Sequence, residues 1–144
     1  MKKLGKYSIV GVILFGGFFI SGCATTAGKA FETSESQVKL RSIQTRAFDT
    51  TDKKKMMQTV ISTMQDLDFV IDKADLMLGS VTGSKFLGNA VISMTVTVRP
   101  RGEKQLLVRA NAQYGITSVE DPATYQDFFT ALEKAMFLTA QQVD

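Results

Sequence analysis

Two segments alternate strictly between apolar and polar residues, and this pattern constrains the fold more than any other feature of the chain. They are Ala90–Val98 and Gln105–Tyr114, joined by Pro100–Lys104. Strict alternation gives a strand one apolar face and one polar face. A five-residue link that contains Pro and Gly suits a hairpin. The sequence therefore predicts an antiparallel pair with one buried face and one hydrated face.

Two other segments have the apolar spacing of amphipathic helices. The first follows Thr50, Thr51 and Asp52, whose side-chain oxygens can cap a helix. Its apolar residues are Met56, Met57, Val60, Ile61, Met64 and Leu67. The methionines also raise a metal-ligand hypothesis, but at helical spacing they favour core packing. The second helix begins with Asp121 as cap and Pro122 in the first position. Its apolar residues are Tyr125, Phe128, Phe129, Leu132, Met136 and Val143.

Three shorter segments complete the predicted sheet. Val38–Phe48 is rich in β-formers, and a slip in its alternation indicates a bulge or a late start. Phe69–Ile71 and Leu76–Phe86 are the other two expected strands. The predicted order is β-α-β-β-β-β-α. This order favours an α+β fold, with an antiparallel sheet of about four to five strands and two helices packed on one face.

The first 22 residues have the three parts of a secretory signal peptide. Lys2, Lys3 and Lys6 form a basic start, and Ile9–Ile20 is an uncharged apolar run. Twelve residues are too few for a relaxed bilayer span, which needs roughly 20. An uncleaved anchor helix is the alternative, but the short run with its glycines favours a cleaved signal.

The end of this segment, Ile20-Ser21-Gly22-Cys23, resembles the lipobox of bacterial lipoprotein precursors. The resemblance implies that the Cys23 sulfur carries a diacylglyceryl group and that a signal peptidase cuts between Gly22 and Cys23. It also implies acylation of the new amino group, with palmitate as a typical acyl chain. Cys23 is the only cysteine, so it has no partner for a disulfide within the chain.

The lipobox divides the chain into three parts. Residues 1–22 are the predicted signal peptide, 23–37 the lipidated cysteine with a small, polar tether, and 38–144 a single globular domain. Ala24 stands where lipoproteins retained in the inner membrane of enteric-type bacteria have aspartate. By that resemblance the protein lies in the cell envelope. In a Gram-negative source the expected location is the inner leaflet of the outer membrane, facing the periplasm.

Composition excludes several functional classes. Three of the 17 Lys and Arg residues lie in the signal segment, so 14 basic residues remain against 14 acidic ones. A nucleic-acid partner, which needs a basic footprint, is therefore not expected. The chain has no histidine, so the commonest catalytic bases and zinc ligands are missing. We expect no enzyme activity, no metal and no cofactor apart from the lipid on Cys23.

One acidic cluster suggests calcium, but its spacing does not support a calcium loop. The cluster consists of Asp66, Asp68, Asp72 and Asp75. An EF-hand loop starting at Asp66 needs an oxygen ligand where Val70 stands and a glycine where Ile71 stands. A solvated turn is the favoured interpretation.

The element order and the anchor together resemble the helix-grip domains of envelope lipoproteins such as the BamC subunit of the outer-membrane assembly machinery. The phrases QTRAFDT, MQDLDFVI and YQDFFTALEKAMFL also resemble small proteobacterial lipoproteins of unassigned role. This likeness concerns fold and anchoring and transfers no function.

Two functional hypotheses follow. The first is a non-enzymatic interaction or accessory module for an envelope complex, whose partner face contains Leu107 as an apolar point beside Arg99 and Arg109. An ordinary solvated sheet explains the same polar residues. The second is a carrier of a lipid or another apolar ligand. Ala110 and Ala112 are small residues opposite a helix rich in phenylalanine, which implies either close packing or a cavity.

Overall fold

The computed structural model describes residues 36–141. A helix covers residues 36–43. The elements that follow are β1 (Thr45–Phe48), α2 (Lys53–Asp66), β2 (Val70–Asp75), β3 (Ser80–Leu87), β4 (Ala90–Arg101), β5 (Gln105–Tyr114), β6 (Thr117–Ser118) and α3 (Pro122–Gln141).

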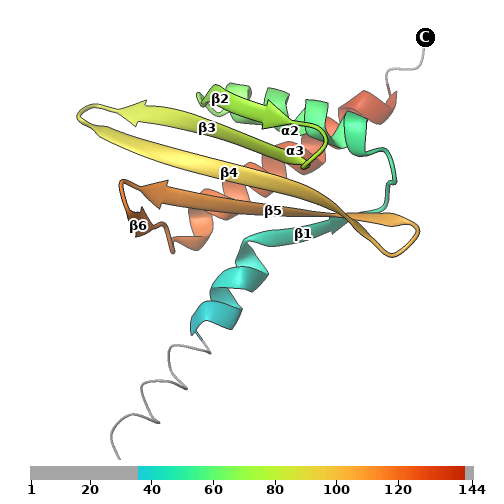
Figure 1. Cartoon of the computed structure of the whole chain (residues 1–144), viewed down its shortest axis with the longest axis horizontal. Helices are drawn as coiled ribbons and strands as arrows, with labels where there is room; N and C mark the ends of the chain where they lie inside the picture. Colours follow the sequence, from blue (N-terminus) through green and yellow to red (C-terminus); the bar gives the residue numbers. More distant parts are fainter. Residues whose placement is uncertain (1–35, 142–144) are drawn as a thin grey trace, which may run out of the picture. The chain divides into compact units, whose positions relative to one another are not determined.

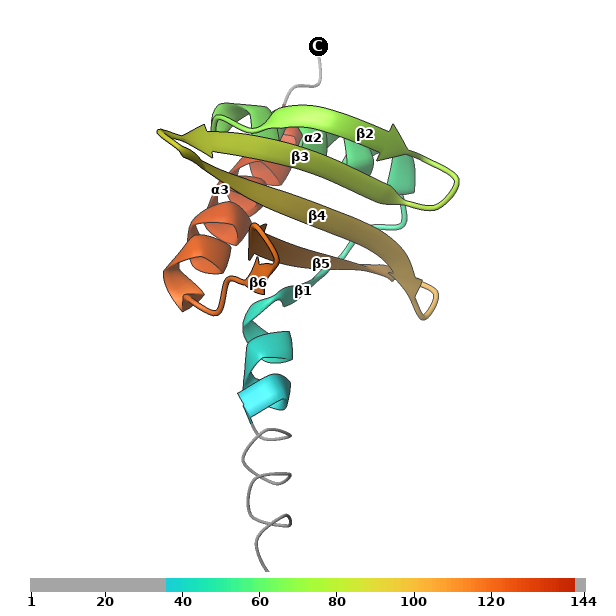
Figure 2. The ribbon, with the colours of Figure 1, turned by 60° about the vertical axis from the view of Figure 1, so that its left-hand side comes forward.

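These strands form one antiparallel sheet in the order β1-β5-β4-β3-β2, and the short β6 pairs with the end of β5. Both α2 and α3 lie on the same face of the sheet (Figures 1 and 2). The predicted α+β class, with an antiparallel sheet and helices on one face, is therefore confirmed. The structure adds two elements that the sequence did not indicate, the helix over residues 36–43 and strand β6.

The core lies between the sheet and these two helices. The strand residues that face it are Met94, Val96 and Val98 of β4 and Leu106, Val108, Ala110 and Ala112 of β5, of which Val96, Val108 and Ala110 are completely buried. The largest fully buried side chains from the helices are Tyr125, Phe128, Phe129, Met56, Met64 and Leu132. The methionine stripe thus packs in the core. Val143, the last apolar residue predicted for α3, lies outside the described residues.

The hairpin of β4 and β5 forms as predicted, but its turn is shorter than the expected Pro100–Lys104 link. Pro100 lies within β4 and pairs with Leu106, while only residues 102–104 form the turn. Pairing of β4 with β3 already ends at Thr97, so Pro100 has a strand on one side only. Proline is tolerated there because no ladder bond toward a second neighbour is lost.

The prediction of a strand beginning at Val38 is wrong, because residues 36–43 are helical. Leu40 and Ile43, three positions apart, are partly buried against the core, whereas Val38 is 65% exposed. The Gln44 N–H donates to the Leu40 carbonyl at 3.1 Å and continues the helical bonding. The interrupted alternation in this segment therefore reflects the three-residue spacing of Leu40 and Ile43 on a helix. This helix also includes residues 36 and 37, which the sequence assigned to the tether.

Leu76 to Gly79 form a turn and not the start of β3, which is a second correction. Asp75 Oδ1 accepts from the Leu78 N–H at 2.9 Å, and Lys53 Nζ donates to the Met77 carbonyl at 3.1 Å. Gly79 has a φ of 67°, which glycine adopts without steric cost. A Cβ there would lie 2.4 Å from the Val98 carbonyl oxygen. Gly79 therefore closes the turn.

Both predicted helix caps are present. Asp52 Oδ1 accepts from the Lys55 N–H at 2.9 Å, and Asp121 Oδ1 accepts from the Ala123 N–H at 3.2 Å. Each cap satisfies a backbone donor that the first helical turn leaves without a partner.

Thr63 of α2 provides a stability test of the core. Its side chain is 1% exposed, and its Oγ1 has no hydrogen-bond partner within the described residues. A buried hydroxyl without a partner costs about 1–3 kcal/mol of desolvation. Thr63→Val keeps the branched shape, and we expect it to raise the free energy of unfolding by about 1 kcal/mol. Urea denaturation measures the change, with Ser62→Ala, an exposed neighbour, as control. A destabilised Thr63→Val variant would show that the hydroxyl is satisfied in solution.

Candidate functional site

The face of the sheet opposite the helices is not covered by any described element, and we call it the open face (Figure 1). Its side chains are mostly neutral and polar, with hydroxyl and amide groups. On the central strands and β1 they are Thr45, Ala47, Ser80, Thr82, Ser84, Phe86, Val91, Ser93, Thr95, Thr97, Arg99, Arg101, Gln105, Leu107, Arg109, Asn111 and Gln113. The predicted hydrated face is therefore present.

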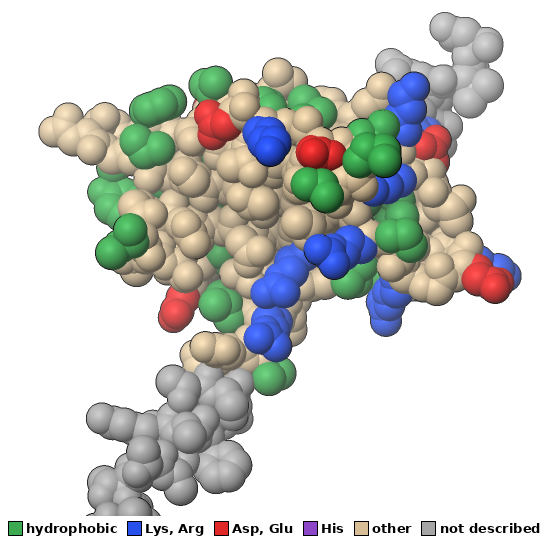
Figure 3. All heavy atoms as spheres, in the orientation of Figure 1, with side chains coloured by type: hydrophobic (Ala, Val, Ile, Leu, Met, Phe, Trp, Pro, Cys, Tyr) green, Lys and Arg blue, Asp and Glu red, His purple; other side chains and the backbone are tan. Residues whose placement is uncertain are grey.

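Register brings the three residues predicted for a partner face together. Arg99 of β4 pairs directly with Leu107 of β5, and Arg109 follows two positions along β5 on the same side. Leu107 and Arg109 are half-buried, and Arg99 is exposed. In Figure 3, Lys and Arg side chains form a band across the open face over β1, β5 and β4. The arrangement is an apolar side chain between two cations.

Arg109 lies between Thr97 of β4 and Thr45 of β1. Its Nε is buried and has no hydrogen-bond acceptor among the described residues. The only ion pair within residues 36–141 joins Lys85 to Asp68, so neither Arg99 nor Arg109 has an acidic partner in this part of the chain. The guanidinium groups of the open face therefore remain available to an external acceptor.

Beside Arg109 the open face contains a polar hollow of about 290 Å³. Its lining consists of Gln44, Ser93, Thr95, Asn111, Ala112, Gln113 and Ser118. None of these side chains carries a charge. The polar hollow lies where β5 passes from its pairing with β1 to its pairing with β6. Its hydroxyl and amide side chains can both donate and accept hydrogen bonds, which suits a neutral polar group.

A tyrosine closes the gap between β1 and β6. The Tyr125 hydroxyl donates to the Val119 carbonyl and accepts from the Gln44 amide at 3.1 Å and the Ala112 N–H at 3.3 Å. These bonds fix Gln44, which is 4% exposed, at the margin of the polar hollow. Sequence reasoning missed Gln44 and Ser118, because a single buried glutamine and a two-residue strand leave no periodic signal.

The same tyrosine bears on the carrier hypothesis. Ala110 and Ala112 are 0% and 2% exposed, and the Tyr125 ring reaches the sheet closely enough to bond the Ala112 backbone. Of the two outcomes considered for these small residues, close packing of α3 is the one observed here. The alanines admit the aromatic helix and do not line an apolar chamber at this point.

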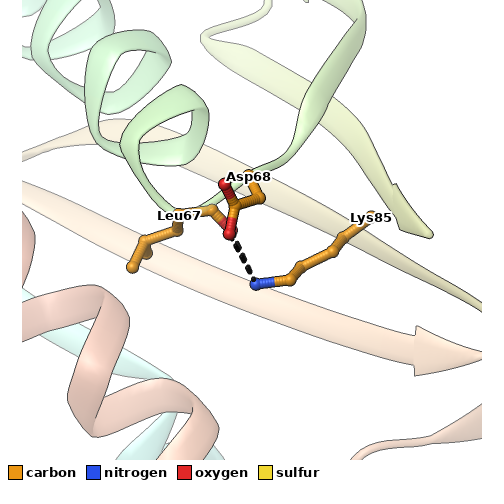
Figure 4. Close-up of polar contacts among 3 residues, drawn as sticks. All are labelled: Leu67, Asp68 and Lys85. Atoms are coloured by element: carbon orange, nitrogen blue, oxygen red, sulfur yellow. Dashed lines mark hydrogen bonds and ion pairs between the residues drawn. The ribbon is translucent and has the colours of Figure 1, made fainter. Parts of the chain in front are cut away.

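The acidic cluster does not form a common site. Asp72 accepts from the Ser84 hydroxyl at 2.7 Å, and Asp75 binds its own turn. Asp68, with a φ of 65°, approaches Lys85 Nζ at 3.4 Å, and this ammonium also donates to the Leu67 carbonyl at 2.9 Å (Figure 4). Lys85 thus stabilises the C-terminal end of α2. Within residues 36–141, no three Asp, Glu, His or Cys side chains converge to hold a metal ion.

The predicted lipidation residue, Cys23, and the cleavage position after Gly22 lie outside the described residues. Among the helices that the structure describes, none has both the length and the apolar character required to cross a bilayer. Comparison of the chain with family models and with curated proteins found no match.

Proposed function

We propose that this protein is a lipid-anchored, periplasm-facing envelope lipoprotein that acts as a non-enzymatic interaction module for an envelope complex. Cys23 carries the anchor, and the open face binds the partner protein. The observation that carries the second part is the grouping of Leu107 with Arg99 and Arg109, which have no ion pair within the described residues. Arginine is enriched in protein interfaces, where its planar guanidinium binds carboxylates and backbone carbonyls.

The anchor suits this role because it holds the domain at a surface and leaves both layers of the fold uninvolved. Buried acyl methylenes contribute about 0.8 kcal/mol each, so two or three chains hold a protein firmly. A partner in the same compartment then meets the domain at high effective concentration, which compensates for a modest intrinsic affinity.

Site-specific photo-crosslinking in membranes tests the partner face. A photoreactive residue replaces Thr97 on the open face, and the same residue replaces Gln126 on the exposed side of α3 as the matched control. We expect a crosslinked protein from position 97 that is absent from position 126. Leu107→Glu and Arg109→Glu each place a carboxylate on the face and should abolish this product.

Two results would contradict the proposal. One is the same set of products from both positions. The other is a product from position 97 that persists in both charge variants while their melting temperatures show that they are folded. Either result would mean that the open face is an ordinary solvated sheet.

A further inference from the structure

The carboxylates of the open face lie at its edge. Arg99, Arg101 and Arg109 lie on β4 and β5, whereas Asp72 and Asp75 lie on the edge strand β2 together with Lys73. Both carboxylates already accept hydrogen bonds, Asp72 from Ser84 and Asp75 from the Leu78 backbone. Asp49, near the other edge, accepts from Gln105. The acidic groups of the sheet are therefore occupied locally, and the central arginines are not neutralised by them.

The hydrogen bonding of Arg109 is incomplete. A guanidinium has five N–H donors, and the buried Nε of this one has no acceptor. A buried donor on a charged group that lacks its acceptor carries an unrecovered desolvation cost. Carboxylates bind arginine through two parallel hydrogen bonds, which makes them the best-matched acceptors for such a group. A carboxylate from a partner can pair with the terminal N–H groups of this guanidinium, which are not among its buried atoms.

The residues next to Arg109 on the same side of β5 give the rest of the chemistry. Leu107 precedes it, and Asn111 and Gln113 follow, both lining the polar hollow. The face therefore changes within one strand from apolar through cationic to neutral and hydrogen-bonding. The cations of the open face, Lys73, Arg99, Arg101 and Arg109, are separated by Leu107 and by neutral residues and do not form a uniform basic cluster of the kind that selects an anionic lipid surface. The order of apolar, cationic and neutral polar side chains along β5 favours a peptide with mixed side chains over a lipid surface.

We infer that the partner presents an acidic segment to the open face, with carboxylates bound by Arg109 and Arg99 and with neutral polar groups in the polar hollow. The inference rests on the proposed function and adds the chemical class of the partner segment. The positive charges of Arg99 and Arg109 repel basic segments and attract acidic ones. The two arginines therefore determine the specificity and the association rate of binding.

Binding of short peptides to the mature, lipidated protein in neutral detergent tests the inference. The probe is a fluorescent peptide of alternating Glu and Ser, because alternation in an extended chain puts its carboxylates on one side. Matched peptides contain Gln or Lys in place of Glu. We expect the fluorescence anisotropy to rise with protein concentration only for the Glu peptide. The affinity should fall as the salt concentration rises.

Variants then locate the binding. Arg109→Gln is expected to weaken the Glu peptide about tenfold, since hydrogen bonds between charged groups are lost. Arg99→Gln should weaken it by a smaller factor because Arg99 is more exposed. Arg109→Lys should restore only part of the affinity, because lysine cannot form the paired bonds. Lys54→Gln and Lys134→Gln remove one exposed charge each from the helix layer and should leave binding unchanged.

Several outcomes would overturn the inference. Equal binding of the Glu and Gln peptides excludes carboxylate recognition. If Lys54→Gln and Lys134→Gln lose as much affinity for the Glu peptide as Arg109→Gln does, only the net charge of the protein determines binding. Dihexanoyl phosphatidylglycerol is tested below its critical micelle concentration. If it binds more tightly than the Glu peptide and its binding depends on Arg109, the arginines bind a lipid headgroup. A photo-crosslink from position 97 that survives Arg99→Gln and Arg109→Gln leaves the proposed function intact and rejects the acidic segment. Absence of a crosslinked product specific to position 97 in the protein without charge substitutions rejects the proposed function itself.

Discussion

Cys23→Ser is expected to abolish incorporation of a palmitate analogue and to leave the precursor uncut, so that its mass includes the first 22 residues. The physical reason is that a thioether requires the cysteine sulfur, and serine has none. Without two or three acyl chains the protein loses on the order of 10 kcal/mol or more of membrane binding, at about 0.8 kcal/mol per methylene. Metabolic labelling, intact mass and fractionation of envelope membranes measure the three consequences.

Ser21→Ala is the matched control for this substitution. It changes the neighbouring residue but keeps a small side chain in the motif Ile20-Ser21-Gly22-Cys23, so labelling and cleavage should match the wild type. If wild type and Cys23→Ser take up equal label and stay in the same fraction, the anchor does not exist and the proposed location fails with it.

Phe128→Ala is expected to lower the free energy of unfolding by about 3–5 kcal/mol. Phe128 is completely buried, and its ring meets Phe129 edge-on at 5.2 Å between centroids. The substitution removes transfer free energy and leaves a cavity in the core. Against a typical total of about 5–15 kcal/mol, the loss should lower the melting temperature by more than about 10 °C.

The same helix contains a control for this effect. Phe137 is 64% exposed, so Phe137→Ala creates no cavity and should change stability by no more than about 0.5 kcal/mol. Thermal unfolding followed by circular dichroism compares the two variants. Similar melting temperatures for Phe128→Ala and the wild type would mean that α3 does not dock as observed.

The separation of the two layers is compatible with the proposed binding role. α2 and α3 bury the apolar side of the sheet and provide stability, while the opposite side does not contribute to the core. We therefore expect substitutions on the open face to alter the proposed recognition at little cost in folding. The expected contrast between Phe128→Ala and Arg109→Gln, one a loss of stability and the other a loss of binding, follows from this division.

Much of the fold was predictable where the signal is periodic and local. Alternation in Ala90–Val98 and Gln105–Tyr114 defines two central strands because each has one face in the core. Helical spacing in α2 and α3, with Asp52 and Asp121 as caps, has the same local cause. The failures occurred in short segments. Residues 36–43 and Leu76–Gly79 contain β-forming or apolar residues whose final state depends on contacts distant in sequence.

The sequence by itself determined the amphipathic faces of the strands and helices and the grouping of Leu107 and Arg109 on one side of β5, since side-chain direction follows from the period of the backbone. It also predicts the lipid anchor. Only the tertiary structure decided the strand order that brings Arg99 opposite Leu107, the Tyr125 contact that closes the gap beside β6, and the polar hollow. These features join residues from separate strands and helices, and pairing across such distances is selected by the packing of the whole core, which no local pattern encodes.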